Sequence, residues 1–418
     1  MANDKLRLFR KIIVVFLKYG ITYLCQRVGA LAHRWTYKEV SNPKNVVILG
    51  GSFAGIPLAK RLTETLPTGY RVVLIEKNSH FNYLFNFPRY SVLQDHEHKA
   101  FVPYTGLARG APRGIFKIVQ GLATDIGDEE VELKSGGRIR FEYLVIATGT
   151  TQNAPAQVLS TEKEDSCAEL RDMQGKIRSA NSIAIVGGGA VGVQLAGDIK
   201  TFYGDKRVVL VHSRDQLLPN FGKRLHSYVI DKLEHLGVAV MLGERPQLSR
   251  AAGPMSLAFK DGGSQAFDLV IPCTGQTPNS SVLSSFGPDA ISMKNGRILV
   301  KPTLQVQFHD KPSSKGYHIF ALGDVAETGG PKMGRAGLMQ AEIVRANIAS
   351  LIQGNSKLKS YDPDPLEGAL KLSLGKSDCV MYMDDKEGDN FLIPVKGGKE
   401  DLQVAQAWKM LNASMGAS

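Results

Sequence analysis

The chain has 418 residues and a formal net charge of +11, with 43% hydrophobic and 22% charged residues. This length allows two or three domain cores, and the ordinary composition excludes a largely disordered or low-complexity protein. The chain contains four cysteines, which are far apart and form no CxxC pair: Cys25, Cys167, Cys273 and Cys379. This spacing supports neither a zinc site nor a dithiol redox motif, so we predict no metal site.

The N-terminal segment is basic and partly apolar. Residues 1–36 contain seven Lys or Arg side chains and a single acid, Asp4. The apolar run from Ile12 to Leu17 is too short to cross a bilayer, which requires roughly 20 apolar residues. We predict that residues 1–40 form a helix that associates with a membrane surface, at the cytoplasmic face or in the mitochondrion. A mitochondrial targeting sequence and a helix packed on its own domain remain alternatives.

From Asn45 onward the sequence reads as strand, glycine turn, helix and second strand, which is the pattern of a βαβ unit. The turn, GGSFAG at 50–55, is suited to a pyrophosphate that approaches the backbone at a helix N-terminus. The second strand ends in Glu76, whose carboxylate can accept hydrogen bonds from ribose hydroxyls. Ser52 replaces the second glycine of the motif, and its small hydroxyl side chain could donate to phosphate.

The same pattern recurs at 182–214, with the turn GGGAVG between a strand and a helix. All three glycines of the motif are present: Gly187, Gly189 and Gly192. The second strand runs into His212 and Arg214 and has no acid at its end. Because arginine can pair with a ribose 2′-phosphate, we predict that this turn accepts NADPH as well as, or better than, NADH.

Further apolar strands end in small-residue turns. FEYLVIATGT at 141–150 and FDLVIPCTGQTPN at 267–279 follow the two βαβ patterns in the same relative order. GYHIFALGDVAE at 316–327 then ends in a Gly-Asp turn, where Asp324 could hold the ribityl or phosphate end of a flavin. The segment after Cys379 alternates like a hairpin meander, and 401–411 reads as a closing helix.

This order of motifs resembles the flavoprotein reductases that bind two dinucleotides. Within them the chain is similar to the apoptosis-inducing-factor-like group that includes the ferroptosis suppressor proteins, near the type II NADH:quinone dehydrogenases. The resemblance covers roughly 44–412 and extends to GPKMGRAGLMQAEIVRANI at 330–348. It implies FAD and NAD(P)H as cofactors and an α/β fold with two Rossmann-type domains, a small C-terminal α+β module and the N-terminal membrane-associating helix.

Motif order and resemblance together imply a split FAD domain, formed by 44–155 and 286–360, with an NAD(P)H domain inserted at 178–285. Residues 361–418 form the C-terminal module. The residues that the resemblance assigns to FAD are Gly50, Gly51, Ser52, Gly55, Glu76, Lys77, Arg89, Ala123, Thr148, Gly149 and Asp324. Those assigned to NAD(P)H are Gly187, Gly189, Gly192, Gln194, His212, Arg214 and Gly275.

Two assignments bear on the reaction itself. Lys332 matches a lysine close to the isoalloxazine, where its charge, with a helix that starts near Arg335, would stabilise the reduced ring. Gln194 departs from the family, which usually has glutamate there, and this affects nicotinamide preference and rate rather than binding. Hydride transfer needs no acid–base side chain, so we expect no catalytic triad.

The electron acceptor is less constrained. A disulfide reductase would need paired cysteines soon after the first glycine turn, and none is present between Cys25 and Cys167. A sulfide:quinone reductase is also disfavoured, because the contexts of Cys167 and Cys379 do not match. We predict an NAD(P)H:quinone-type oxidoreductase at a membrane, in which Phe391, Leu392 and Trp408 belong to the core rather than to the quinone site.

Two other functions remain open at this point. The first is a flavoprotein with a signalling, cell-death or nucleic-acid-binding role, which the positive charge favours. The folded part shows no long basic run with interleaved aromatics, so nucleic acid is the less expected partner. The second is an FAD reductase for a small soluble acceptor. The sequence does not set the oligomeric state.

Overall fold

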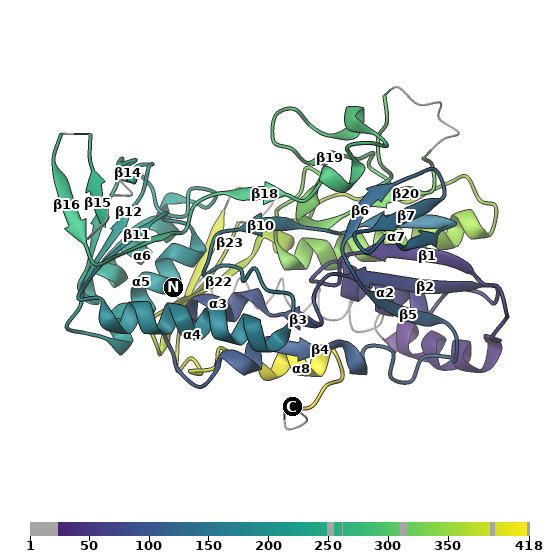
Figure 1. Cartoon of the computed structure of the whole chain (residues 1–418), viewed down its shortest axis with the longest axis horizontal. Helices are drawn as coiled ribbons and strands as arrows, with labels where there is room; N and C mark the ends of the chain where they lie inside the picture. The colour runs from purple at the N-terminus through teal and green to yellow at the C-terminus, as the bar shows by residue number, and fades with distance from the viewer. Residues whose placement is uncertain (1–23, 249–254, 261, 310–315, 385–388, 416–418) are drawn as a thin grey trace.

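The computed structural model describes residues 24–248, 255–260, 262–309, 316–384 and 389–415. Two parallel β-sheets lie at opposite ends of an elongated molecule (Figure 1). The first sheet has the order β20-β9-β1-β2-β5 and the second has the order β13-β12-β11-β17. The predicted α/β fold with parallel sheets is thus confirmed.

The first sheet is covered on both faces, as its continuous apolar strands require. Alternate residues of β1 face opposite sides: Val46 and Ile48 pack with helices α2 and α7, whereas Val47 and Leu49 pack with an antiparallel sheet, β6-β7-β8. The elements of this first unit are β1 (Lys44–Leu49), α2 (Gly55–Thr63), β2 (Tyr70–Glu76), β5 (Phe116–Gln120), β6 (Ala123–Ile126), β7 (Glu130–Leu133), β8 (Arg138–Arg140), β9 (Tyr143–Ile146), β20 (Ile319–Ala321) and α7 (Gly334–Ile352).

The second sheet repeats this arrangement. Ile183 and Ile185 pack with helices α5 and α6, and Ala184 faces a small antiparallel sheet, β14-β15-β16. The elements of this second unit are β11 (Ser182–Val186), α5 (Ala190–Phe202), β12 (Arg207–Val211), α6 (Lys223–His235), β13 (Val238–Met241), β14 (Gln247–Leu248), β15 (Met255–Ala258), β16 (Ser264–Phe267) and β17 (Leu269–Pro272).

The chain passes from the first unit to the second and back again. It leaves after β9 through β10 (Thr150–Gln152) and helix α4 (Lys163–Ser179), and returns through β18 (Gln276–Pro278). Strands β10 and β18 pair antiparallel, so the outgoing and returning segments form a two-stranded ribbon between the units. Strand β20 then completes the first sheet beside β9.

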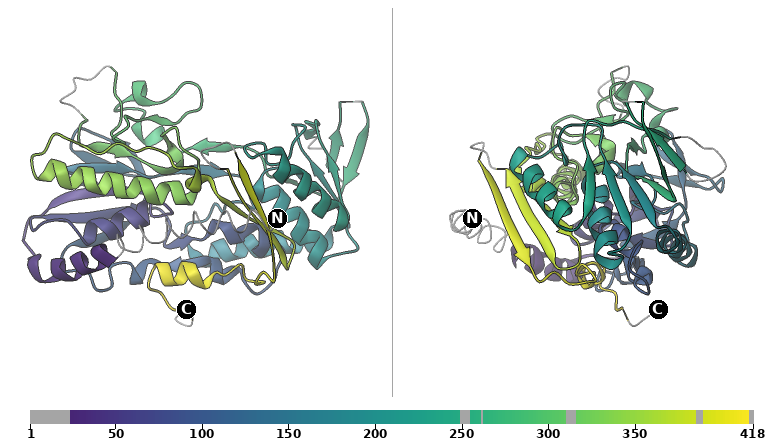
Figure 2. Two further views of the ribbon diagram at one scale, coloured as in Figure 1. Left: turned by 180° about the vertical axis from the view of Figure 1, so that it is seen from behind. Right: turned by 90° about the vertical axis from the view of Figure 1, so that its left-hand side faces the viewer.

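The C-terminal stretch divides between the two units. Strands β23 (Asp378–Asp384) and β24 (Asn390–Lys396) form the predicted hairpin. Strand β22 (Leu370–Leu374), which was not predicted, pairs with β23, and the three strands pack against α5 and α6 (Figure 2). Helix α8 (Ala405–Met410) packs on the first unit instead, where the Trp408 indole donates to the carbonyl of Lys99 at 2.8 Å. The side chains predicted as core are all buried: Phe391, Leu392 and Trp408.

A helix over residues 24–36 lies on the first unit near the end of α2. His33 Nε2 hydrogen-bonds the carbonyl of Leu66 at 2.6 Å, and the Tyr37 hydroxyl donates to the carbonyl of Tyr70 at 2.9 Å. In the part of the chain that the structure describes, no helix is long and apolar enough to cross a membrane. The apolar run at 12–17, on which the predicted membrane helix depends, lies outside the described residues.

Candidate dinucleotide sites

The first glycine turn is fixed by close backbone contacts. Gly50 has φ of +103°, and a Cβ there would lie 2.4 Å from the carbonyl oxygen of Ala147. A Cβ on Gly55 would lie 1.8 Å from the carbonyl oxygen of Gly50. The turn therefore requires glycine at both positions, and it brings the end of β1 against the Ala-Thr-Gly turn that follows β9.

Glu76, at the end of β2, is buried and directed at this turn. Its Oε2 accepts the N–H of Gly51 at 2.5 Å, and its Oε1 accepts the backbone N–H and the side-chain amide of Asn78 at 2.9 and 2.8 Å. Burial raises the pKa of Glu76, while the backbone N–H groups oppose that rise. Tyr104 donates to the carbonyl of Gly51 at 2.6 Å, a contact that the sequence analysis missed because Tyr104 lies outside every motif.

The Gly-Asp turn after β20 meets the first glycine turn. A Cβ on Gly323 and a Cβ on Gly337 would each lie 3.1 Å from the side chain of Ala54. The Gly323 N–H also donates to Gln340 Oε1 at 2.8 Å, which ties the turn to α7. The first glycine turn, the Gly-Asp turn and the start of α7 thus converge, although about 270 residues separate them in sequence.

Asp324 and Lys332 lie together at this convergence. Burial raises the pKa of Asp324, and the nearby cations of Lys332 and Arg297 lower it. Burial lowers the pKa of Lys332, whose ammonium donates to the carbonyl of Ala326 at 2.7 Å. The helix expected near Arg335 is α7, which begins at Gly334 without a side-chain cap.

The second glycine turn has the same geometry as the first. Gly187 has φ of +130°, and a Cβ there would lie 2.4 Å from the carbonyl oxygen of Cys273. A Cβ on Gly192 would lie 1.9 Å from the carbonyl oxygen of Gly187. Gly189 has no atom within 4 Å of the position where its Cβ would lie, so this side of the turn is open.

His212 takes the place in the second unit that Glu76 has in the first. Its Nδ1 accepts the N–H of Gly188 at 3.1 Å. Burial, with a smaller contribution from Arg214, lowers the pKa of His212, so the ring is neutral at pH 7 and its proton is on Nε2. That buried Nε2 has no hydrogen-bond partner among the described residues.

The remaining predicted residues lie around these turns with more exposure. Arg214 is exposed two residues beyond His212, and no hydrogen bond of its side chain is formed within the described ranges. Gly275 is exposed, with φ of +84° and no atom within 4 Å of the position of a Cβ. Half-buried positions near the first turn are Ser52, Lys77 and Ala123.

A pair of turns joins the two units. The Thr148 hydroxyl donates to the carbonyl of Asn279 at 2.7 Å, and the Asn279 amide donates back to the carbonyl of Thr148 at 2.9 Å. The backbone N–H of Asn279 also donates to the carbonyl of Gly149 at 3.0 Å. Asn279 is the last residue of the motif FDLVIPCTGQTPN, but nothing in that sequence indicated its contact with Thr148.

Two predicted residues contact the C-terminal stretch. The Gln194 amide donates to the Ser373 hydroxyl at 3.1 Å, which links α5 to β22. Arg89, in the short helix α3 (Phe87–Tyr90), is fully buried and forms an ion pair with Asp198 at 2.8 Å. Its guanidinium also donates to the carbonyl of Gly375 at 2.7 Å. Because the side chain of Arg89 is fully buried, it cannot contact a flavin in this arrangement. Its contacts instead link both units to the C-terminal stretch.

The cysteines form no redox pair. All four are free thiols, and burial raises the pKa of Cys273, beside the second turn, to about 12. A thiol with this pKa is protonated at neutral pH and is a poor nucleophile. Within the described residues no three His, Cys, Asp or Glu side chains are grouped as metal ligands.

Comparisons with known proteins agree with this geometry. The family described as pyridine nucleotide-disulphide oxidoreductase matches residues 44–344. Fe-regulated protein 8 of Mycosarcoma maydis is 35% identical over 392 residues, which cover 87% of this chain and 94% of that protein. Ferroptosis suppressor protein 1 of Homo sapiens is 28% identical over 388 residues, which cover 90% of this chain and 97% of that protein.

Among solved structures, the sulfide:quinone oxidoreductase of Aquifex aeolicus has a TM-score of 0.69 to this chain at 19% identity. The match covers 90% of this chain and 93% of that one, so nearly the whole fold is shared. The chain belongs to the pyridine nucleotide-disulphide oxidoreductase family and is an oxidoreductase that uses FAD and NAD(P)H.

Proposed function

We propose that the first turn holds FAD, that the second holds NAD(P)H, and that the protein passes electrons from NAD(P)H to a quinone at a membrane surface. The observation that supports this most directly is the pair of matching turns joined by the contacts between Thr148 and Asn279. The corresponding domains are 44–155 with 286–360 for FAD, 178–285 for NAD(P)H and 361–418 for the C-terminal module.

The first unit fits FAD. Helix α2 begins without a side-chain cap. The Ile56 N–H donates to the carbonyl of Ser52 and Pro57 has no N–H, so this helix start offers a pyrophosphate the N–H of Gly55, beside Gly50, Gly51 and Ser52. Glu76 and Lys77 would meet the adenosine ribose, and Ala123 the adenine. The flavin end would lie by Thr148, Gly149 and Asp324. We do not include Arg89, because it is fully buried in its contacts with Asp198 and Gly375.

The second unit fits NAD(P)H. Helix α5 also begins without a side-chain cap, and its N-cap residue Gly189 leaves room for a phosphate. The neutral ring of His212 leaves its Nε2–H without a hydrogen-bond partner among the described residues and brings no negative charge to the site. Arg214 is exposed and close by, as pairing with a 2′-phosphate requires. Gly187, Gly192, Gly275 and Gln194 would line the rest of the site.

The flavin, when bound, supplies the hydride and electron chemistry, and the protein supplies orientation and charge. Lys332 is the side chain that we assign to catalysis. Its ammonium is held by the carbonyl of Ala326 near Asp324, one residue before Met333, the N-cap of α7. A cation and a helix N-terminus directed at the same point favour negative charge there.

An aromatic cluster beside the first turn suits an apolar ring as the acceptor. The rings of Phe53 and Phe85 lie 4.7 Å apart, those of Tyr83 and Phe85 lie 5.6 Å apart, and Phe85 is 54% exposed. A Cβ on Gly334 would lie 3.4 Å from Phe53, so the cluster borders the start of α7. Aromatic faces of this kind stack with quinones. The aromatic-rich run FNYLFNF at 81–87 was the available sequence signal.

The membrane location depends on the basic N-terminal segment. Helix 24–36 exposes Leu24, Val28, Leu31 and Trp35, and the apolar run before it lies outside the described residues. An exposed apolar stripe next to basic side chains is typical of a helix that lies in a membrane interface. This would bring the protein to an apolar quinone at the cytoplasmic face of a membrane or in the mitochondrion.

The test is oxidation of NADPH and NADH by the full-length flavoprotein with a short-chain quinone as acceptor, followed by absorbance. We expect quinone-dependent turnover, and Phe85→Ser should raise the KM for quinone about tenfold, the effect of losing roughly 1.4 kcal/mol of stacking. Leu159→Ser, at another exposed apolar side chain that belongs to none of the motifs, is the matched control. Flavin that NADPH reduces but no quinone reoxidises would reject the quinone and leave the two-nucleotide assignment intact.

A further inference from the structure

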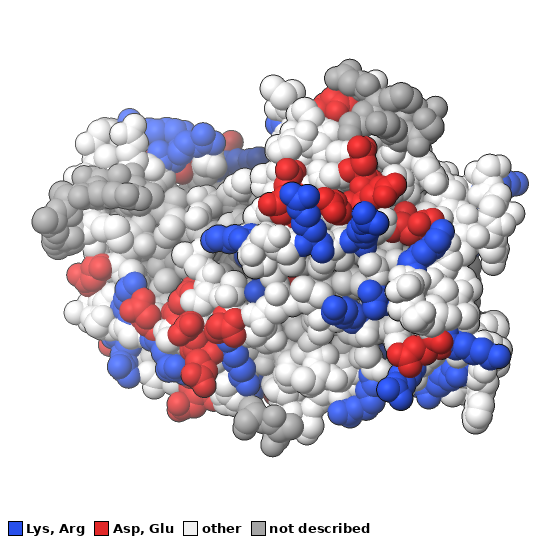
Figure 3. All heavy atoms as spheres, turned by 45° about the vertical axis from the view of Figure 1, so that its right-hand side comes forward, with Lys and Arg blue, Asp and Glu red and all other residues white. Residues whose placement is uncertain are grey.

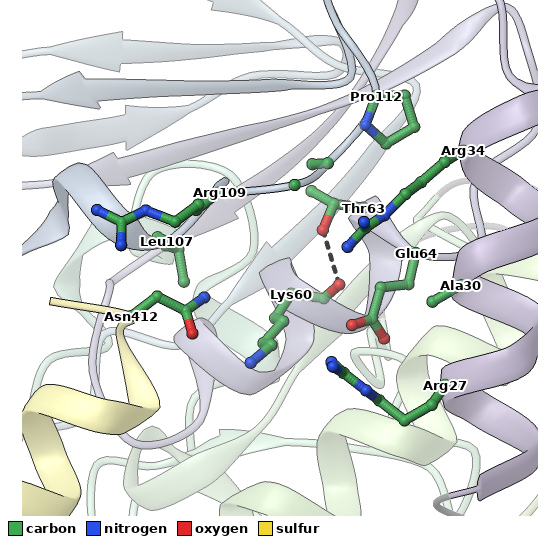
Figure 4. Close-up of a pocket in the computed structure, with 12 residues that line it drawn as sticks. Arg27, Ala30, Arg34, Lys60, Thr63, Glu64, Leu107, Arg109, Pro112 and Asn412 are labelled. Carbon is green, nitrogen blue, oxygen red and sulfur yellow. Dashed lines mark hydrogen bonds between the residues drawn. The ribbon is translucent and has the colours of Figure 1, made fainter.

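A cavity of about 60 Å³ lies where helix 24–36 and the segment at Asn412 meet the first unit (Figure 4). Its walls come from helix 24–36, from the end of α2, from the segment 107–112 and from Asn412. Four basic side chains line it: Arg27, Arg34, Lys60 and Arg109. None of the predicted dinucleotide residues borders this cavity.

Three of these basic side chains, Arg34, Lys60 and Arg109, form no ion pair among the described residues. Among the described residues that line the cavity, Glu64 is the one acid, and its carboxylate is ion-paired with Arg61, which is outside the lining. Across the described ranges, no acceptor lies within hydrogen-bond or ion-pair distance of the side-chain nitrogens of Arg34, Lys60 or Arg109. Cations collected in a concave site repel one another and raise the local concentration of anions.

The backbone is shaped to admit one of these cations. Gly110 has φ of +80°, and a Cβ there would lie 2.7 Å from a terminal guanidinium nitrogen of Arg34. The positive φ favours glycine at this position, and the guanidinium of Arg34 lies against the backbone of the segment 107–112. Arg34 thus reaches the cavity from helix 24–36, opposite Arg109 on the segment 107–112.

The size of the cavity selects the anion. A single water needs about 10–15 Å³ by this measure, so 60 Å³ accommodates about four to six heavy atoms. A phosphate group has five heavy atoms, whereas a nucleotide is several times larger. Arginine forks match phosphate oxygens in pairs, so a terminal phosphate with three free oxygens suits this lining.

The outer surface of the same helix suggests where the phosphate comes from. Leu24, Val28, Leu31 and Trp35 recur at helical spacing and are 65%, 60%, 54% and 89% exposed. Figure 3 shows basic side chains gathered at the end of the molecule where this helix lies, close to an uncharged surface. Apolar side chains that include an exposed Trp, with basic side chains on an adjacent face, suit the boundary between lipid headgroups and acyl chains.

We infer that this cavity binds the phosphomonoester headgroup of an anionic phospholipid while the apolar stripe enters the membrane interface. The inference rests on the proposed membrane location and is independent of the cofactor assignments. The stripe anchors the protein to any bilayer, and the cavity adds selectivity for a lipid with a terminal phosphate. It also fixes the orientation of the first unit on the membrane, because the arginines come from two separate segments.

The test compares full-length protein on vesicles of phosphatidylcholine mixed with either phosphatidic acid or phosphatidylserine, at matched surface potential, by co-sedimentation. We expect wild type to prefer phosphatidic acid about tenfold, as for one charge-assisted pair. The double variant Arg34→Gln, Arg109→Gln should abolish that preference. The control Lys38→Gln, Arg113→Gln removes equal charge outside the cavity and should weaken both mixtures equally.

Three outcomes would overturn the inference: no preference in wild type, equal loss of preference in both double variants, or saturation by inorganic phosphate that leaves vesicle binding unchanged. A stripe that pairs two copies would give a dimer that Trp35→Ser dissociates, which would also overturn it. Flavin content and reduction by NADPH are measured on the same preparations. If flavin binding or its reduction by NADPH is lost while the preference for phosphatidic acid remains, the proposed function is rejected and the lipid site is not.

Discussion

The glycine turns of the two βαβ units have the same backbone geometry, but a different residue accepts a hydrogen bond from the second glycine of each turn. In the first, a carboxylate oxygen of Glu76 accepts the N–H of Gly51 at 2.5 Å. In the second, the imidazole of His212 accepts the corresponding N–H of Gly188 at 3.1 Å. Backbone contacts therefore fix the turn, while the residue at the strand end is free to change the charge that faces the ligand. We relate the anionic acceptor to a ribose and the neutral acceptor to a phosphorylated ribose.

The units also differ in how they are enclosed. The first turn is covered by the Gly-Asp turn and by α7, whereas the second leaves Gly189, Arg214 and Gly275 open or exposed. An enclosed site suits a cofactor that stays bound, and an open site suits one that exchanges in each turnover. Four sets of variants test this comparison.

The largest effects are expected at the third glycine of each turn. Gly55→Ala and Gly192→Ala place a Cβ 1.8 and 1.9 Å from a carbonyl oxygen. Such overpacking costs about 1–3 kcal/mol or more, which would weaken binding of the ligand about 5–150-fold. Gly55→Ala should purify without flavin colour, and Gly192→Ala should remain yellow but react slowly with NADPH. Gly175→Ala, where no atom lies within 4 Å of a Cβ, is the control.

Glu76→Gln should weaken FAD by about 1.5–3 kcal/mol, because a charged acceptor is replaced by a neutral one. In the apoprotein, by contrast, the same substitution should make the free energy of unfolding less sensitive to rising pH. Burial raises the pKa of Glu76 above its ordinary value of 4.5, so its stabilising contribution is fully present below that value and is lost as pH rises through the raised pKa. Urea midpoints of the apoprotein should fall less between pH 4.5 and pH 7.5 in Glu76→Gln than in wild type. An identical fall would contradict the buried carboxylate.

Nucleotide preference should change at the end of β12. Arg214→Ala should weaken NADPH by about 1–3 kcal/mol and NADH far less, because only NADPH has the 2′-phosphate. His212→Glu, which copies the first unit, should shift the preference in the same direction. Dissociation constants from stopped-flow flavin reduction measure both, with Lys223→Ala as the control for general loss of charge. Equal weakening of the two nucleotides would refute the role of Arg214.

The smallest effect is expected at Gln194. Its hydrogen bond to Ser373 should contribute about 0.5–1.5 kcal/mol. A double-mutant cycle of Gln194→Ala and Ser373→Ala, read by urea unfolding, should show coupling of that size. Additive losses would mean that this bond does not connect α5 to the C-terminal sheet in solution.

The sequence was sufficient where local pattern decides the structure. Apolar strands, the two glycine turns, the meander of β23 and β24 and the start of α7 all follow from spacing and turn chemistry. Even the substitution at Ser52 left the turn intact, since the steric demands fall on Gly50 and Gly55. These features depend on neighbours along the chain, which a sequence displays directly.

The sequence was insufficient where distant segments meet. Arg89 and Asp198 are 109 residues apart and form a buried ion pair that the hydrophobic pattern of the sequence does not predict. The same holds for Tyr104 against Gly51 and for Asn279 against Thr148. The sequence identified His212 by its position at the end of a strand, but the hydrogen bond that it accepts from Gly188 is seen only in the structure. Contacts between residues far apart in the sequence depend on how the elements pack, and local sequence patterns do not predict that packing.

The position of β20 at the edge of the first sheet has a consequence for synthesis. The first sheet gains this strand only when residue 321 has left the ribosome, and α8, which covers its unit, follows some 85 residues later. During synthesis the first unit stays incomplete, with apolar surface exposed, until the second unit has been made. The second unit can meanwhile fold on its own. Chaperone demand should therefore fall on the amino-terminal third, and chains that terminate early should be degraded rather than accumulate as a flavin-binding fragment.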